Sequence, residues 1–109
     1  MTKPQPWSSA DATIIINALA RDLDLDFHFT NHVRDRMDER GLRIGDILHV
    51  LKNGFVYEPA AVATREKFYK YALKSKSPNS GARDLCVIAI PDPANIAVKI
   101  VTIMWVDER

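Results

Sequence analysis

One histidine and two arginines follow one another at four-residue intervals, a spacing that suits chemistry on a phosphate group. The residues are His32, Arg36 and Arg40. Because four residues make about one helical turn, these side chains would lie along the same side of a helix. A guanidinium binds a phosphate through two parallel N–H donors, and an imidazole titrates near neutral pH. The pattern indicates a site that could serve phosphodiester chemistry.

The same three residues also fit a structural role. In a helix, Val33 and Met37 would face the core, and Arg40 would lie about 20° and Arg36 about 60° from Val33. Arginines beside an apolar stripe can pair with local carboxylates or cover the edge of a sheet, and His32 can simply pack next to them. Two arginines four residues apart repel each other unless an anion compensates. The sequence leaves both interpretations open.

Residues 65–83 form a second candidate, a basic and aromatic segment. Its cations are Arg65, Lys67, Lys70, Lys74, Lys76 and Arg83, whereas Glu66 is its one acid before Asp84. Tyr69 and Tyr71 alternate with the lysines, and aromatic rings that stack on bases beside cations that meet phosphates are typical of single-stranded nucleic-acid grooves. The alternative is a strand whose tyrosines and Leu73 face the core while its lysines protect an exposed edge.

Other reactive side chains give weaker patterns. Cys86 is the one cysteine, so the chain cannot form an intramolecular disulfide, and its apolar neighbours predict a buried thiol. Trp105 ends an apolar run and is expected in the core. His28 and His49 have no carboxylate pattern of the kind that binds metals. We therefore expect no metal site and no cofactor.

Composition predicts one globular domain. The chain has 109 residues, of which 47% are hydrophobic and 27% charged, and this usage is ordinary for a folded protein. The formal net charge of +1 argues against a general polyanion binder, so a basic surface must be local. No run approaches the roughly 20 apolar residues of a membrane span. We expect a cytoplasmic protein.

Hydrophobic periodicity predicts helices followed by strands. Helices are expected at residues 9–21 and 31–40, and a third one should end at Asn53-Gly54. A short strand is expected at residues 27–29. Longer strands are predicted at residues 55–58, 67–76, 84–90 and 96–106. The fold class is α+β, with N-terminal helices packed on a C-terminal four-stranded antiparallel sheet, in which residues 67–76 lie near an edge or groove.

Five short motifs occur in order along the chain. They are His32-x-x-x-Arg36-Met37-x-x-Arg40-Gly41, Ile47-Leu48-x-x-Leu51-x-x-Gly54, Lys70-Tyr71, Arg83-Asp84-Leu85 and Val98-Lys99-Ile100-Val101-Thr102-Ile103-Met104-Trp105. Over about residues 27–107 they resemble a domain-of-unknown-function family of small bacterial proteins near the RelE/ParE toxin superfamily. The resemblance implies a RelE/ParE-like domain at residues 27–107, preceded by an N-terminal arm and extra helix at residues 1–26.

The resemblance also implies a function and a partner. A RelE-like toxin would cut messenger RNA without a metal ion, free or on the ribosome, and a cognate antitoxin protein would neutralise it. His32 would be the acid or base, Arg36 and Arg40 would stabilise transition-state charge, and Tyr69 or Tyr71 would stack on a base or donate a proton. The expected contacts to the RNA backbone are Lys67, Lys70, Lys74, Lys76 and Arg83.

Two other functions remain open. A non-catalytic module could use the basic segment to bind nucleic acid or an acidic protein. A ParE-like protein would instead inhibit gyrase, and RNA would then be irrelevant.

Overall fold

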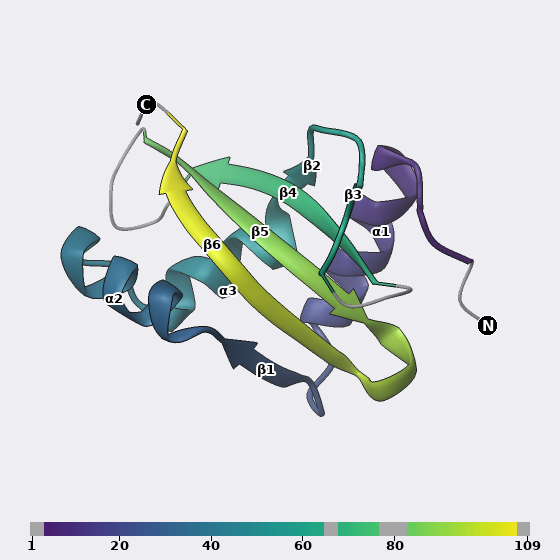
Figure 1. Ribbon diagram of the computed structural model, residues 1–109, viewed down its shortest axis with the longest axis horizontal. Coiled ribbons are helices and arrows are strands. Elements are labelled where there is room, and N and C mark those ends of the chain that lie inside the picture. Colours follow the sequence, from purple (N-terminus) through teal and green to yellow (C-terminus); the bar gives the residue numbers. More distant parts are fainter. Residues whose placement is uncertain (1–3, 65–67, 77–82, 107–109) are drawn as a thin grey trace.

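The computed structural model of the protein describes residues 4–64, 68–76 and 83–106. These ranges form a mixed α+β fold with helices and strands in the predicted order (Figure 1). The elements are α1 (Ser9–Ala20), β1 (Asp26–Phe29), α2 (Asn31–Arg40), α3 (Ile44–Asn53), β2 (Phe55–Val56), β3 (Ala61–Val62), β4 (Tyr69–Lys76), β5 (Asp84–Asp92), the 3-10 helix η1 (Pro93–Asn95) and β6 (Ala97–Trp105).

The helices begin and end where the sequence provides caps. The Ser8 hydroxyl accepts the Asp11 amide at the start of α1, over 3.1 Å, and the Thr30 hydroxyl accepts the Val33 amide at the start of α2, over 3.2 Å. Gly41 ends α2 with a φ of 64°, which a glycine adopts without strain. The three predicted helices are therefore confirmed. Among the helices of the described ranges, none combines the length and apolar character that crossing a membrane requires.

Within the described residues the sheet has six strands, in place of the expected four. Its order is β1-β6-β5-β4-β2, and β3 also pairs with β4. The extra strands have two origins: β1 joins the sheet in parallel to β6, and residues 55–64 contain two short strands where one strand and a loop were expected. Strand β4 is not the edge strand itself, because the short strand β2 pairs outside it, but it lies one strand in from the edge and its Lys70 lines a groove, in line with the expected place near an edge or groove.

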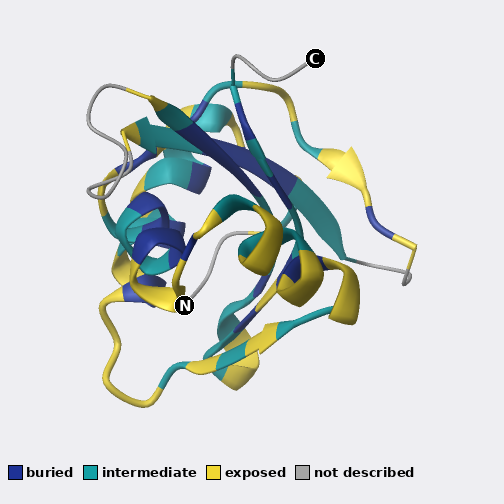
Figure 2. Ribbon diagram, turned by 90° about the vertical axis from the view of Figure 1, so that its left-hand side faces the viewer, coloured by how far each residue is buried: buried dark blue, intermediate teal, exposed yellow. Residues whose placement is uncertain are grey.

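Helices cover one face of the sheet. Helix α3 packs on β4 and β5, α2 packs on β6, and α1 packs on α3 and β2. In Figure 1, α1 and α3 lie behind the sheet, and in Figure 2 buried residues concentrate between the helices and the strands. The core includes Ile16 from α1, Leu51 from α3 and Val87 from β5. In the described part of the chain no helix covers the opposite face, which we call the open face.

Candidate functional site

Strand β4 separates its tyrosines from its lysines. Tyr71 and Leu73 belong to the hydrophobic core, and Tyr69 packs against it. Lys70 and Lys74 line hollows on the open face. This separation follows from the alternation of side chains along a strand. The interpretation in which the tyrosines and Leu73 face the core is confirmed, and the rings do not share a surface with the lysines.

Tyr71 is tied into the interior. Its side chain has 0% exposure, its hydroxyl accepts the Trp7 backbone N–H over 3.1 Å, and it donates to the Gln5 side-chain oxygen over 3.0 Å. Burial raises the pKa of Tyr71, and the hydrogen bond from Trp7 offsets part of that rise. A side chain without exposed surface cannot touch a substrate, so Tyr71 does not belong to the candidate site in this conformation.

The three α2 residues differ in their surroundings. His32 is exposed on the first turn, and Arg36 is half-buried. The Arg40 side chain is only 12% exposed, and its Nη1 lies 3.3 Å from Glu39 Oε2. Pairing with a local carboxylate is the structural role that the sequence left open for Arg40. None of the three lines the groove described below.

The predicted cations of the basic segment are also dispersed. Lys76 Nζ lies 3.8 Å from Asp84 Oδ1, and the Arg83 guanidinium lies 4.2 Å from the centroid of the Trp105 ring. Trp105 itself is buried, as predicted. Arg65 and Lys67 lie outside the described residues. Of the predicted cations that the structure describes, Lys70 is therefore the one in the main groove.

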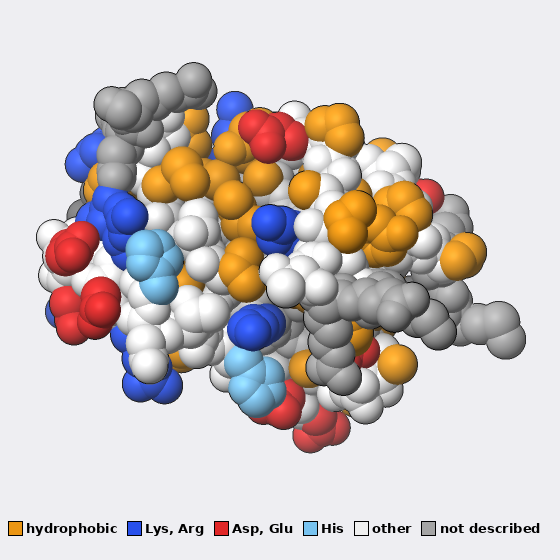
Figure 3. All heavy atoms as spheres, in the orientation of Figure 1, with side chains coloured by type: hydrophobic (Ala, Val, Ile, Leu, Met, Phe, Trp, Pro, Cys, Tyr) orange, Lys and Arg blue, Asp and Glu red, His pale blue; other side chains and the backbone are white. Residues whose placement is uncertain are grey.

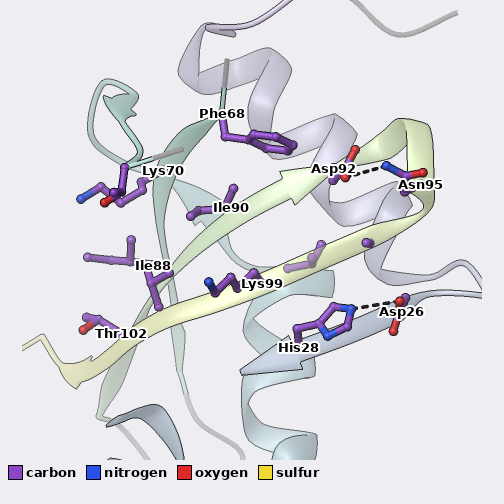
Figure 4. A pocket seen from close by; sticks show the side chains of 14 residues that line it. Asp26, His28, Phe68, Lys70, Ile88, Ile90, Asp92, Asn95, Lys99 and Thr102 are labelled. Carbon is purple, nitrogen blue, oxygen red and sulfur yellow. Dashed lines mark hydrogen bonds and ion pairs between the residues drawn. The ribbon is translucent and has the colours of Figure 1, made fainter. Parts of the chain in front are cut away.

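The open face contains a groove of about 780 Å³ between β1 and β4. Figure 4 shows its principal side chains, and Figure 3 shows apolar side chains over the middle of this face with Lys or Arg side chains between them. Ile88 and Ile90 of β5 form part of its lining. The polar and aromatic residues that line the groove are Asp26, His28, Thr64, Phe68, Lys70, Asp92, Asn95, Lys99 and Thr102.

A β-bulge shapes the middle of the groove. Thr102 of β6 pairs with Ile88, but the next pair along β5 joins Ala89 to Ile100, so Val101 is left without a partner in the ladder. Two consecutive β6 residues, Val101 and Thr102, consequently line the groove. A bulge bends the strand and redirects a side chain, and this irregularity frequently occurs beside functional sites.

A histidine and a carboxylate meet at one side of the groove. His28 Nε2 lies 2.9 Å from Asp26 Oδ2, and both residues come from β1, two positions apart and so on one strand face. When the imidazole is neutral, this contact orients Nε2–H toward the carboxylate and leaves Nδ1 to accept a proton. Lys99 is the parallel-strand partner of His28. An ammonium group, an imidazole and an orienting carboxylate therefore occupy adjacent strands.

Charges across the groove are mixed. Lys70 comes from β4, and Lys99 comes from β6, two strands away, so their backbones are separated by roughly 10 Å. At the end near η1, the Asp92 carboxylate accepts a hydrogen bond from the Asn95 amide over 2.9 Å. Phe68 extends over the groove on the β4 side, as Figure 4 shows. The groove thus offers two cations, an aromatic ring and an imidazole to one extended ligand, together with the carboxylates of Asp26 and Asp92.

Sequence reasoning missed His28, Asp26 and Lys99 as members of one site. A signal for the first two existed, because an aspartate and a histidine two positions apart share one face of any strand. Placing the strand at residues 27–29 left Asp26 outside it. No local signal could have joined them to Lys99, because that proximity depends on parallel pairing across 71 residues of chain.

Comparison with known proteins identifies the family. A model described as Domain of unknown function (DUF4258) matches residues 29–105. The chain therefore belongs to that family. The prediction that it belongs to a domain-of-unknown-function family is confirmed. No curated protein and no solved structure matches the chain. The relation to RelE/ParE toxins thus remains an expectation.

Proposed function

We propose that this protein binds single-stranded RNA in the open-face groove and cleaves it without a metal ion. The observation that carries the proposal is the His28–Asp26 contact of 2.9 Å beside Lys99, at the rim of a groove that also contains Lys70. RNA supplies its own nucleophile, the 2′-hydroxyl, so cleavage needs a proton acceptor and positive charge near the phosphate. The groove contains both.

The proposed reaction is an internal transphosphorylation. His28 Nδ1 accepts the 2′-hydroxyl proton, the 2′-oxygen forms a bond to phosphorus, and the bond from phosphorus to the 5′-oxygen breaks. The departing oxygen takes a proton from water, and His28 later returns its proton to solvent. Lys99 offsets the charge of the five-coordinate phosphate, and Asp26 orients the imidazole. The products are a 2′,3′-cyclic phosphate and a 5′-hydroxyl.

This assignment moves the proposed centre from α2 to β1, and a single experiment separates the two. A labelled single-stranded RNA is incubated with wild type, His28→Ala or His32→Ala in EDTA, and the RNA ends are mapped. We expect His28→Ala to lower the cleavage rate by about 10²–10⁴-fold, the usual contribution of a general base, and His32→Ala to leave it nearly unchanged. The opposite result would place the chemistry on α2.

Binding without cleavage is a second candidate function. The exposure of the His28 and Asp26 side chains, 57% and 65%, favours it, because a solvated pair is weakly held. Fluorescence anisotropy with labelled RNA tests binding separately from cleavage. Lys70→Ala and Lys99→Ala should each weaken binding. Each should also reduce, by about 0.7, the steepness with which the logarithm of the binding constant falls with the logarithm of the salt concentration. Lys52→Ala, on α3 behind the sheet, is the matched control. Absence of binding by wild type at low salt would overturn both functions.

The toxin role implied by the resemblance is part of the proposal. Inducible expression of wild type should arrest growth, and His28→Ala should relieve the arrest if RNA cleavage causes it. An antitoxin that neutralises the protein would have to block the groove. Arrest that persists in His28→Ala, together with inhibited supercoiling by purified gyrase, would instead support the ParE-like alternative.

A further inference from the structure

A second hollow lies on the open face beside the groove. Its volume is about 480 Å³, and Ile88 lines both hollows, so a ligand that crosses Ile88 passes from one into the other. The second hollow is bordered by the segment that follows β2, by β4 and β5, and by the end of β6. The side chains that matter below are Tyr57, Glu58, Ala72, Lys74, Cys86 and Met104.

Two contacts position the polar groups of this hollow. The Tyr57 hydroxyl lies 3.2 Å from Cys86 Sγ, which fixes the phenol ring against β5. Lys74 Nζ lies 4.8 Å from the centroid of the Tyr57 ring and 5.6 Å from that of Phe55. An ammonium group within about 6 Å of a ring face is attracted to it. Lys74 is therefore held beside the hollow as a positioned cation.

The lining suits a flat, mainly apolar group that is attached to an anion. Ala72 and Met104 provide apolar contact, and the Tyr57 ring provides an aromatic surface. Lys74 provides positive charge next to them, and Glu58 adds one carboxylate to the same lining. A nucleotide combines the same two properties, because each base has an apolar ring face and each linkage has a charged phosphate. Because Ile88 lines both hollows, this hollow adjoins the proposed RNA groove.

We infer that the second hollow is a nucleobase subsite for the same RNA strand that occupies the groove. The inference rests on the proposed function. A base enters between Tyr57 and Met104, and its phosphate meets Lys74. The subsite lengthens the footprint beyond the groove and makes affinity depend on the number of nucleotides bound.

The test uses 2′-O-methyl RNA, which lacks the free 2′-hydroxyl and so reports binding alone. Fluorescein-labelled strands of three and eight nucleotides are titrated into wild type, Tyr57→Leu and Lys52→Ala, with thermal unfolding as a check on the fold. Wild type should bind the longer strand more tightly. Tyr57→Leu should weaken that binding about tenfold, as the loss of one stacked base does, and leave the shorter strand unchanged.

Methyl NMR on wild type needs no substitution, so its result does not depend on whether a variant folds correctly. Saturation with the eight-nucleotide strand should shift the methyl signals of Ile90, in the groove, and Met104, in the second hollow. If only Ile90 shifts and Tyr57→Leu binds the longer strand like wild type, the subsite is overturned while the proposed function stands. If neither signal shifts with either strand, the proposed function fails as well.

Discussion

Trp7 stacks on Tyr71 across 64 residues of sequence, with ring centroids 5.3 Å apart and planes inclined by 21°. The Trp7 backbone N–H also donates to the Tyr71 hydroxyl. Trp7 precedes the first helix and lies outside the segment that matches the family, residues 29–105. Its side chain is nevertheless 5% exposed and part of the core. The N-terminal arm therefore completes the core of this chain.

Trp7→Ala should destabilise the protein by about 3–5 kcal/mol, because it removes a large buried ring and leaves a cavity beside Tyr71. Urea unfolding followed by circular dichroism measures the change. Leu23→Ala is the control. Because Leu23 is fully exposed, this substitution should change the free energy of unfolding by no more than about 0.5 kcal/mol. Equal stability of the two variants would show that the arm does not pack as described.

Tyr71 should make stability fall at alkaline pH. Its pKa is raised in the folded protein, mainly by burial, above the ordinary value of 10.0. The folded state then holds the phenolic proton more tightly than the unfolded state, so the stabilising effect is complete below pH 10 and is lost as pH rises through the folded pKa. The free energy of unfolding should decline less between pH 9 and 11 in Tyr71→Phe than in wild type. Parallel declines would contradict the assignment.

Gly54 should tolerate no side chain. A Cβ placed on it would lie 2.5 Å from the Val50 carbonyl oxygen and 2.7 Å from that of Lys74, so the end of α3 and strand β4 would have to separate. Gly54→Ala should cost about 1–3 kcal/mol or more, as overpacking does. A Cβ on Gly41 would meet no atom within 4 Å. The stability that Gly41→Ala loses, on the order of 1 kcal/mol, therefore comes from the φ of 64° alone. Chemical denaturation of both variants should rank Gly54→Ala as the less stable.

Cys86 should react slowly with thiol reagents. Its side chain is 2% exposed, and burial raises the pKa of the thiol, an effect that the hydrogen bond with Tyr57 partly offsets. The reactive thiolate is therefore scarce as well as covered. At pH 8 the reaction with a disulfide reagent should be at least about 100-fold slower than for a free cysteine, the factor expected from an opening that costs about 3 kcal/mol. A rapid reaction without urea would mean that this part of the open face is accessible.

Much of the architecture follows from local sequence, but the candidate site does not. The caps at Ser8 and Thr30, together with Gly41, fix the helix ends through contacts within one turn, so the sequence predicts them well. The short strands β2 and β3 have too few residues for a periodic signal, and only their pairing with β4 defines them. The fold class could therefore be predicted, whereas the number of strands could not.

The sequence by itself determined the alternation that places Tyr71 and Lys70 on opposite faces of one strand, because successive side chains of any strand point in opposite directions. It also determined that Cys86 and Trp105 would be buried, because their neighbours are apolar. Only the tertiary structure decided which face the helices cover, and hence that Tyr71 is enclosed while Lys70 lines a groove.

The tertiary structure likewise decided that His28, rather than His32, stands beside a lysine in that groove. His28 and Lys99 meet through parallel pairing of β1 with β6, a contact between segments far apart in the chain. Parallel strands need a long connection, here the helices and the rest of the sheet, so no local pattern reports which residues will become partners.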